Sequence, residues 1–233
     1  DFREDENPAV LYDISGNGHS GTIKGGATWT GAGLQFDGST GYVDLGDIGD
    51  LGTNFTIISV AKSEEATKQA LFGRISSTTA SANGKGFLIR KDAGEGAWRL
   101  WAYDGVEDPN YLNHAIDSDP SNDWALLTAR ADSSSLQFIV GPKTTGDKRT
   151  YAGMVDYSGN RYCVGRLSYM SSWFFQGTVG YIAVYNRTLS DAELLAVQGD
   201  IRDDMERRGV DLPQPRDLIP PMVVLQTDDG ELS

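Results

Sequence analysis

The stretch that decides the fold is residues 175–190, FQGTVGYIAVYNRTLS. Its middle part, residues 179–185, is rich in β-branched and aromatic side chains and predicts a strand. The stretch ends on Ser190, and Glu193 follows three residues later, which is the pattern of a capping box at the start of a helix. We therefore expect a strand that leads directly into a capped helix near the end of the chain.

The helix expected after Ser190 has one apolar stripe, formed at three- and four-residue spacing by Leu194, Val197, Ile201 and Met205. Arg207 and Arg208 fall in its last turn, where cations suit the helix dipole, and Gly209 ends it. Beyond the helix the chain is rich in proline, which predicts an extended tail. Within this tail, residues 222–225 are expected either to add one more strand or to dock on a neighbouring chain.

Upstream of the closing stretch, short apolar pieces alternate with turn residues and predict an all-β domain. Residues 55–60 are β-branched and nearly continuous, as in a strand that is buried on both faces. No helical period precedes residue 188, which excludes parallel strands joined by helices and favours antiparallel sheets. Further strands are expected at residues 42–45, 70–75, 86–90, 97–103, 124–131, 136–140 and 161–165.

Composition limits the organisation and the partners of the chain. With 233 residues, of which 39% are hydrophobic, we expect a single large domain over residues 1–210 and a tail over residues 211–233. The single cysteine excludes an internal disulfide and a cysteine-based zinc cluster. The formal net charge of −13 argues against nucleic acid as a partner, and no apolar run is long enough for membrane insertion.

Three segments carry a family signature. Residues 11–22, LYDISGNGHSGT, are followed by GATW at 26–29 and by LQFDGSTGYV at 34–43. Residues 122–124, NDW, precede a predicted strand pair, and residues 175–190 close the series. In this order the segments resemble the laminin G-like, or concanavalin A-like, lectin/glucanase superfamily over about residues 9–195.

The resemblance implies a jelly-roll sandwich of two antiparallel sheets, here with a C-terminal helix and an extended tail. Such domains usually bind glycans or proteins through their rim loops or concave face. They are common in secreted, cell-surface and phage-tail proteins. The resemblance therefore implies a glycan or glycoprotein as partner and an extracellular, cell-surface or virion location.

The resemblance also implies a candidate Ca²⁺ site at the rim. Asp13 and Asn17 match the opening half of the family's site, whereas Gly180 and Tyr181 replace the acidic pair of its closing strand. Asp, Asn and Gly in this order also favour tight turns held by their own side chains. Two interpretations stay open, a purely structural turn and a Ca²⁺ site that uses Asp13 and Asn17.

No catalytic pattern stands out, and we expect no enzyme and no catalytic residue. Glycosidases need two carboxylates on either side of the scissile bond. The glucanase branch of the resembled superfamily places them as Glu-x-Asp-x-x-Glu, a run that this chain lacks. The chain has two histidines, His19 and His114, and each falls in a turn-rich segment.

Aromatic residues are the best candidates for ligand binding. Alternation along residues 97–103 places Arg99, Trp101 and Tyr103 on one face of a strand, where aromatic rings stack on sugars and the guanidinium donates hydrogen bonds. The alternative is that Trp101 and Tyr103 fill the space between the two sheets. Trp173, just before the closing strand, is expected on an exposed rim loop.

Two functions remain after these exclusions. The first is a non-catalytic carbohydrate- or glycoprotein-binding module for adhesion or recognition. The second is a structural or assembly protein, such as a phage-tail or capsid-decoration component, whose tail fastens onto neighbouring protein chains. The Trp, Tyr and Arg residues favour the first function, and the extended tail favours the second.

Overall fold

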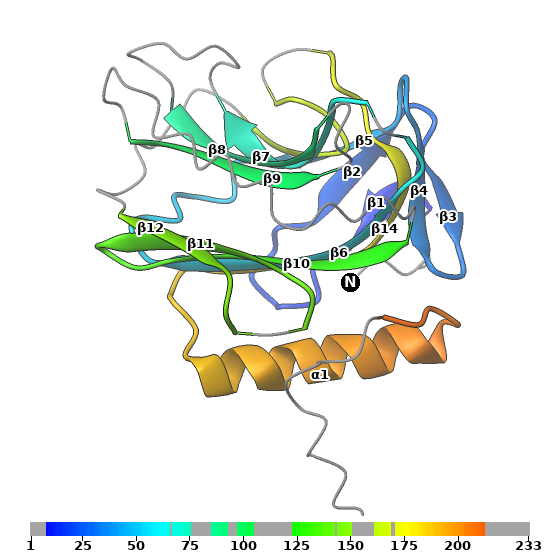
Figure 1. Cartoon of the computed structure of the whole chain (residues 1–233). Helices are drawn as coiled ribbons and strands as arrows, with labels where there is room; N and C mark the ends of the chain where they lie inside the picture. Colours follow the sequence, from blue (N-terminus) through cyan, green and yellow to red (C-terminus); the bar gives the residue numbers. More distant parts are fainter. Residues whose placement is uncertain are drawn as a thin grey trace, which may run out of the picture.

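The computed structural model describes residues 8–65, 67–75, 85–92, 97–104, 123–142, 144–150, 161–168 and 171–212. These residues form two stacked β-sheets of seven strands each and one helix, α1 (Asp191–Arg207) (Figure 1). Every strand pair in both sheets is antiparallel. The antiparallel sandwich expected from the sequence is confirmed.

The strands divide evenly between two sheets, which we call sheet A and sheet B. Sheet A has the order β1 (Val10–Leu11), β2 (Gly21–Lys24), β5 (Tyr42–Gly46), β13 (Tyr162–Val164), β7 (Gln69–Ile75), β8 (Lys85–Lys91) and β9 (Trp98–Asp104). Sheet B has the order β12 (Asp147–Thr150), β11 (Ser135–Val140), β10 (Trp124–Ala131), β6 (Phe55–Ser63), β14 (Gln176–Tyr185), β4 (Gly33–Asp37) and β3 (Thr28–Thr30).

The main hydrophobic core lies between the two sheets. The central strand β6 shows how it is built, because Phe55 and Ile57 belong to this core whereas Ile58 and Val60 face the opposite side of sheet B. All four side chains are buried, which confirms a strand covered on both faces. Phe175, just before β14, is fully buried in the same core.

Helix α1 covers the outer face of sheet B, beneath which it lies in Figure 1. Its capping box is present, since the Ser190 hydroxyl accepts from the backbone of Glu193 and the Glu193 carboxylate accepts from the backbone of Ser190. Three of the four residues of the expected apolar stripe, Leu194, Ile201 and Met205, are buried. The fourth, Val197, is half-buried, and Gln198 is buried in addition. The buried members Leu194, Ile201 and Met205 pack on sheet B in one cluster with Ile58, Val60, Leu126 and Ile139.

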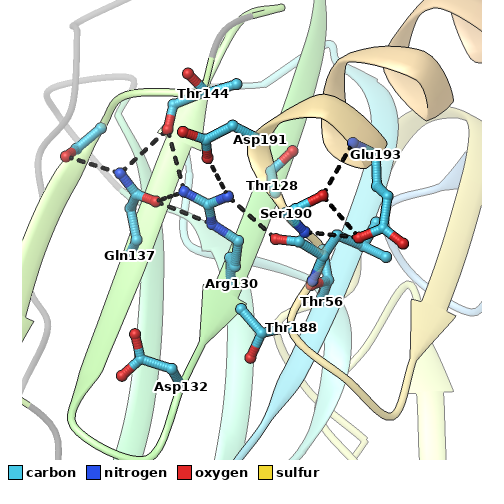
Figure 2. Close-up of polar contacts among 12 residues, drawn as sticks. Thr56, Thr128, Arg130, Asp132, Gln137, Thr144, Thr188, Ser190, Asp191 and Glu193 are labelled. Atoms are coloured by element: carbon cyan, nitrogen blue, oxygen red, sulfur yellow. Dashed lines mark hydrogen bonds and ion pairs between the residues drawn. The ribbon is translucent and has the colours of Figure 1, made fainter.

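A polar network fixes the start of α1 on sheet B (Figure 2). Arg130 on β10 donates through Nη1 to the carboxylate of Asp191 (2.5 Å) and to the carbonyl of Leu189 (3.2 Å). Its Nη2 donates to Gln137 on β11 (2.7 Å). The backbone N–H of Leu189 donates to the Thr56 hydroxyl on β6 (2.9 Å). The network thus ties the helix start to three strands and explains why the helix lies flat on this sheet.

The strands of the middle and closing parts lie close to their expected positions, and β10 matches its expected bounds. Strand β2 was not expected, because its four residues contain one large apolar side chain, Ile23. Strand β12 was not expected either, since its sequence is polar. Packing continues past the expected domain end at residue 210, because Leu212 is buried against α1 and sheet B.

The tail from residue 213, and with it the predicted segment 222–225, lies outside the described residues. The assembly function that depended on this tail therefore stays a prediction. Among the described residues, no helix is long and apolar enough to cross a membrane.

Candidate functional site

Strand β9 divides its side chains between the main core and the outer face of sheet A. Trp98 and Leu100 are buried in the core between the sheets. Trp101 belongs to a separate small cluster with Ala70, Ile75, Leu88 and Leu167. The alternation expected along this strand is confirmed, and the alternative that placed Trp101 between the sheets is wrong.

Trp101 is packed by a second tryptophan and by an arginine. Trp173 lies with its ring edge-to-face to that of Trp101, with 5.8 Å between the ring centroids. The Cζ atom of Arg90 on β8 lies 4.0 Å from the centroid of Trp101 and 5.6 Å from that of Trp173. Cations at this distance are attracted by the negative faces of aromatic rings. As a result Trp101 is only 7% exposed, whereas Trp173 is half-buried and keeps part of its ring accessible.

Charged side chains surround this aromatic pair. The Asp92 carboxylate lies between two arginines, with Oδ1 at 2.8 Å from Nη1 of Arg90 and Oδ2 at 2.8 Å from Nε of Arg99. Arg90 and Arg99 face each other in the register of β8 and β9. The exposed Lys68 places its Nζ 5.6 Å from the centroid of Trp173. In a protein of net charge −13, this part of sheet A therefore brings three cations beside two indole rings.

Trp173 reaches sheet A on the connection between β13 and β14, which we call the strap (residues 165–175, described except for 169 and 170). Its backbone bonds to β7, because Ala70 donates to the carbonyl of Trp173 (2.8 Å) and Gly165 donates to that of Leu71 (2.8 Å). Ser168 also exchanges hydrogen bonds with the backbone of Ile75 at the other end of β7. The strap is thus held along the whole length of one strand.

The local conformation of the strap places two neighbouring aromatic residues on opposite sides of the sheet. Trp173 has a φ of 53°, an uncommon left-handed conformation for a residue with a side chain. Phe175, two residues later, enters the main core and contacts Phe36 and Trp98. The well-packed Phe175 and the backbone bonds to β7 together hold Trp173 in this conformation.

The structure brings three of the four predicted ligand-binding residues into one region. Trp101 and Trp173 contact each other and Arg90, and Arg99 is linked to Arg90 through the carboxylate of Asp92. Tyr103 belongs to β9, but its side chain lies outside the described part of the structure. The role of these four residues in ligand binding stays a prediction, and the arrangement of the three described side chains is compatible with it.

Sequence reasoning missed Arg90, Asp92 and Lys68 as members of this region. Arg90 follows Leu88 by two residues, so alternation alone places both on the face opposite to Phe87. What the sequence did not contain is the pairing register, which sets Arg90 opposite Arg99 and Leu88 opposite Trp101. Asp92 follows the end of β8 and Lys68 precedes the start of β7, so the alternation of side chains along a strand does not place either of them.

Asp13 and Asn17, the candidate Ca²⁺ ligands, form a hydrogen-bonded turn. The two carboxylate oxygens of Asp13 accept from the backbone N–H groups of Ser15 (2.8 Å) and His19 (2.9 Å). Burial raises the pKa of Asp13, but hydrogen bonds with Ser15 and His19 outweigh it and hold the pKa below its usual value. The Asn17 amide donates to the Ser15 hydroxyl (2.8 Å).

Ca²⁺ takes six to eight oxygen ligands, whereas in this turn each carboxylate oxygen of Asp13 already accepts one backbone hydrogen bond, which gives the carboxylate a structural role. Within the described ranges, no three side chains of His, Cys, Asp or Glu are grouped so that they could hold a metal ion. The geometry favours the structural turn.

Comparison with solved structures shows the fold. The fourth domain of an extracellular GH43 arabinanase from Geobacillus stearothermophilus, in complex with arabinotriose, superimposes with a TM-score of 0.61 at 16% identity, over 82% of this chain and 97% of that domain. The binding domain of botulinum neurotoxin serotype D superimposes with a TM-score of 0.62 at 12% identity, over 85% of this chain. This chain spans 50% of the toxin domain.

Comparison with curated protein sequences finds no match. Comparison with family models finds one that matches residues 37–195, which is more than half of the chain and includes the closing strand and the start of α1. With the sandwich topology described above, this match shows that the chain belongs to the concanavalin A-like lectin/glucanase superfamily.

Proposed function

We propose that this domain is a non-catalytic carbohydrate-binding module and that the glycan binds on the outer face of sheet A, at Trp173. The observation that carries the proposal is the difference between the two outer sheet faces. Helix α1 covers that of sheet B with apolar side chains, whereas that of sheet A holds the half-buried Trp173, packed on the buried Trp101 and Arg90, with Lys68 beside its ring.

The arrangement suits a sugar chemically. Trp173 offers an indole face on which the C–H groups of a sugar ring stack, while Trp101 behind it fixes the orientation of that ring. Lys68 and Arg99 carry N–H donors for hydroxyl groups at the border of the stacked ring. Asp92, which also pairs with the buried Arg90, holds Arg99 in place through an ion pair.

Two structural neighbours support this chemistry. The arabinanase domain was solved with arabinotriose, and the botulinum neurotoxin serotype D ligand-binding domain was solved with N-acetylneuraminic acid, at a TM-score of 0.60 and 11% identity. Both share the fold of this chain. An extracellular or cell-surface location follows from the proposal, since the glycans that such modules bind lie outside the cell.

The same region argues for binding without hydrolysis. Glycosidases require a pair of carboxylates about 5–10 Å apart across the scissile bond. Among the described side chains around Trp173, Asp92 supplies a carboxylate, and it is engaged by both Arg90 and Arg99. We therefore expect retention of glycans without turnover, which a reducing-sugar assay on the retained polysaccharides measures.

A glycan array with the full chain, followed by titration of the best ligand, tests the proposal. Trp173→Ala should weaken binding at least tenfold, which corresponds to about 1.4 kcal/mol. Tyr12→Ala is the matched control, because Tyr12 is an exposed aromatic residue (37%) outside this region, and it should leave affinity unchanged. No binding to any glycan, or equal affinity of the two variants, would refute the proposed site.

A further inference from the structure

Strand β14 has one edge that is paired along only half of its length. On one side it pairs with β6 from Gly177 to Tyr185. On the other side it pairs with β4, but only from Gln176 to Val179. Within the described residues, no strand pairs with this second edge from Ile182 to Tyr185. A β-bulge between Val179 and Tyr181 marks the change between the two halves.

Burial changes at the same position. Residues 177–180 of β14 are buried, and residues 181–185 are half-buried. Two of the latter, Ile182 and Val184, point toward the core between the sheets and pack against it. Half-buried aliphatic side chains on the inner face of a sheet indicate that a cover is missing beside this half of the strand.

A groove of about 720 Å³ runs beside this free edge. Its lining is mixed: Leu45, Ile48, Leu51, Phe72 and Val164 contribute apolar side chains, and polar side chains such as Asp13, His19 and Asp50 line it as well. On the surface of the described part, Tyr12 and Ile14 stand out as large apolar side chains with 37% and 65% exposure, and both line this groove. A strand edge without a partner, beside a groove that offers apolar side chains, is an arrangement that accepts an added strand.

We propose that residues 222–225 of the same chain, Met-Val-Val-Leu, add to the free edge of β14 as a further strand and fill this groove. The first argument is the place where the described chain ends. Leu212 is buried in the cluster beneath sheet B, against which Tyr181 and Tyr185 also pack, and these two tyrosines line the groove. Arg208 donates to the carbonyl of Gly180 (3.1 Å), which lies two residues before the part of β14 that starts at Ile182.

The second argument is length. Ten residues lead from Leu212 to Met222, and an extended chain of this length reaches about 30 Å. The tail thus leaves the domain beside the groove and has enough chain to enter it.

The third argument is the sequence of the segment. Strands that are covered on both faces are continuous apolar runs, and residues 222–225 form such a run. A strand at this edge has the core on one face and Tyr181 and Tyr185 on the other. Pro220 and Pro221 precede the run, and because proline donates no hydrogen bond, the strand is expected to begin after them.

Hydrogen exchange on the full chain tests the proposal, with Val224→Pro as the disrupting variant and Asp229→Pro as its matched control outside the run. The readout is the set of amides from Ile182 to Tyr185 that do not bond to β6. In the wild type and in Asp229→Pro these amides should be protected, and in Val224→Pro they should exchange at least tenfold faster. Both variants change residues outside the described part of the chain, and Asp229→Pro controls for the introduction of a proline into the tail.

Equal exchange in all three proteins would overturn the proposal. Protection that falls on dilution, together with a dimer in sedimentation that Val224→Pro abolishes, would also overturn it, because the strand would then come from a second copy. Protection that is independent of concentration and lost only in Val224→Pro is the expected result.

Discussion

The two outer sheet faces of this sandwich are covered in different ways. The face of sheet B is closed by α1, a 17-residue helix that seals an apolar cluster beneath Leu194, Ile201 and Met205. The face of sheet A is crossed by the strap, which brings Trp173 and leaves it half-buried among charged side chains. The difference agrees with the proposal that the outer face of sheet A binds glycans, whereas apolar packing closes that of sheet B.

Leu194→Ala should have the largest effect. Leu194 is a residue of α1 and is fully buried between this helix and sheet B. Its truncation removes apolar contacts and leaves a cavity, at a cost of about 2–5 kcal/mol in the free energy of unfolding. Urea denaturation measures this loss. Val197→Ala, on the half-buried side of the same helix, should cost less than half as much. A loss of glycan affinity in Leu194→Ala under native conditions would contradict the division between the faces.

Low pH should destabilise the turn that follows β4 and connects sheet B to sheet A. Burial raises the pKa of Asp37, but the hydroxyl and backbone hydrogen bonds from Thr40, with those from Gly41 and Ser39, outweigh it and hold the pKa well below its usual value. Because the folded pKa lies below the unfolded pKa of about 3.9, the stabilisation is present above that pH and is lost as pH falls.

Asp37→Asn should therefore flatten the decrease in stability between about pH 5 and pH 2, and it should cost less at pH 7 than Leu194→Ala. Urea titrations at several pH values check this. Asp203→Asn, on the surface of α1, is the control that should keep the wild-type slope. An unchanged slope in Asp37→Asn would show that this turn is not a source of acid sensitivity.

Ser190→Ala should cost about 1 kcal/mol, because it removes the cap of the helix that closes sheet B. Thermal unfolding measures the change. Ser190→Asn keeps a capping side chain and should recover most of the loss. Equal melting temperatures for the Ala and Asn variants would show that α1 is held by its apolar stripe and by Arg130 alone.

Arg99→Gln should have the smallest effect on stability and a clear effect on binding. Because Asp92 keeps its ion pair with Arg90, the substitution leaves no buried charge unpaired, and the free energy of unfolding should change by less than about 1 kcal/mol. Loss of one donor to a sugar hydroxyl should weaken glycan affinity about three- to tenfold. Isothermal titration and urea denaturation on the same variant give the two values. If Arg99→Gln lost stability but kept its glycan affinity, Arg99 would have a structural role and no role in binding.

The sequence by itself determined the local elements. Alternation separated Trp98 and Leu100 from Arg99 and Trp101, and the capping box placed the start of α1 at Ser190. These features depend on residues that are neighbours in the chain, so the sequence contains all the information they need. The order of three segments also sufficed to indicate the superfamily.

Only the tertiary structure decided which of these residues meet. Arg90 reaches Trp101 because β8 and β9 pair in one register, and Trp173 reaches it because the strap is bonded along β7. The structure also gave Asp13 its place in a turn, in which its carboxylate accepts from the backbone N–H groups of Ser15 and His19, while its role as a Ca²⁺ ligand stays a prediction. Register, strap path and hydrogen-bond partners join residues far apart in sequence, and no local pattern fixes such pairs.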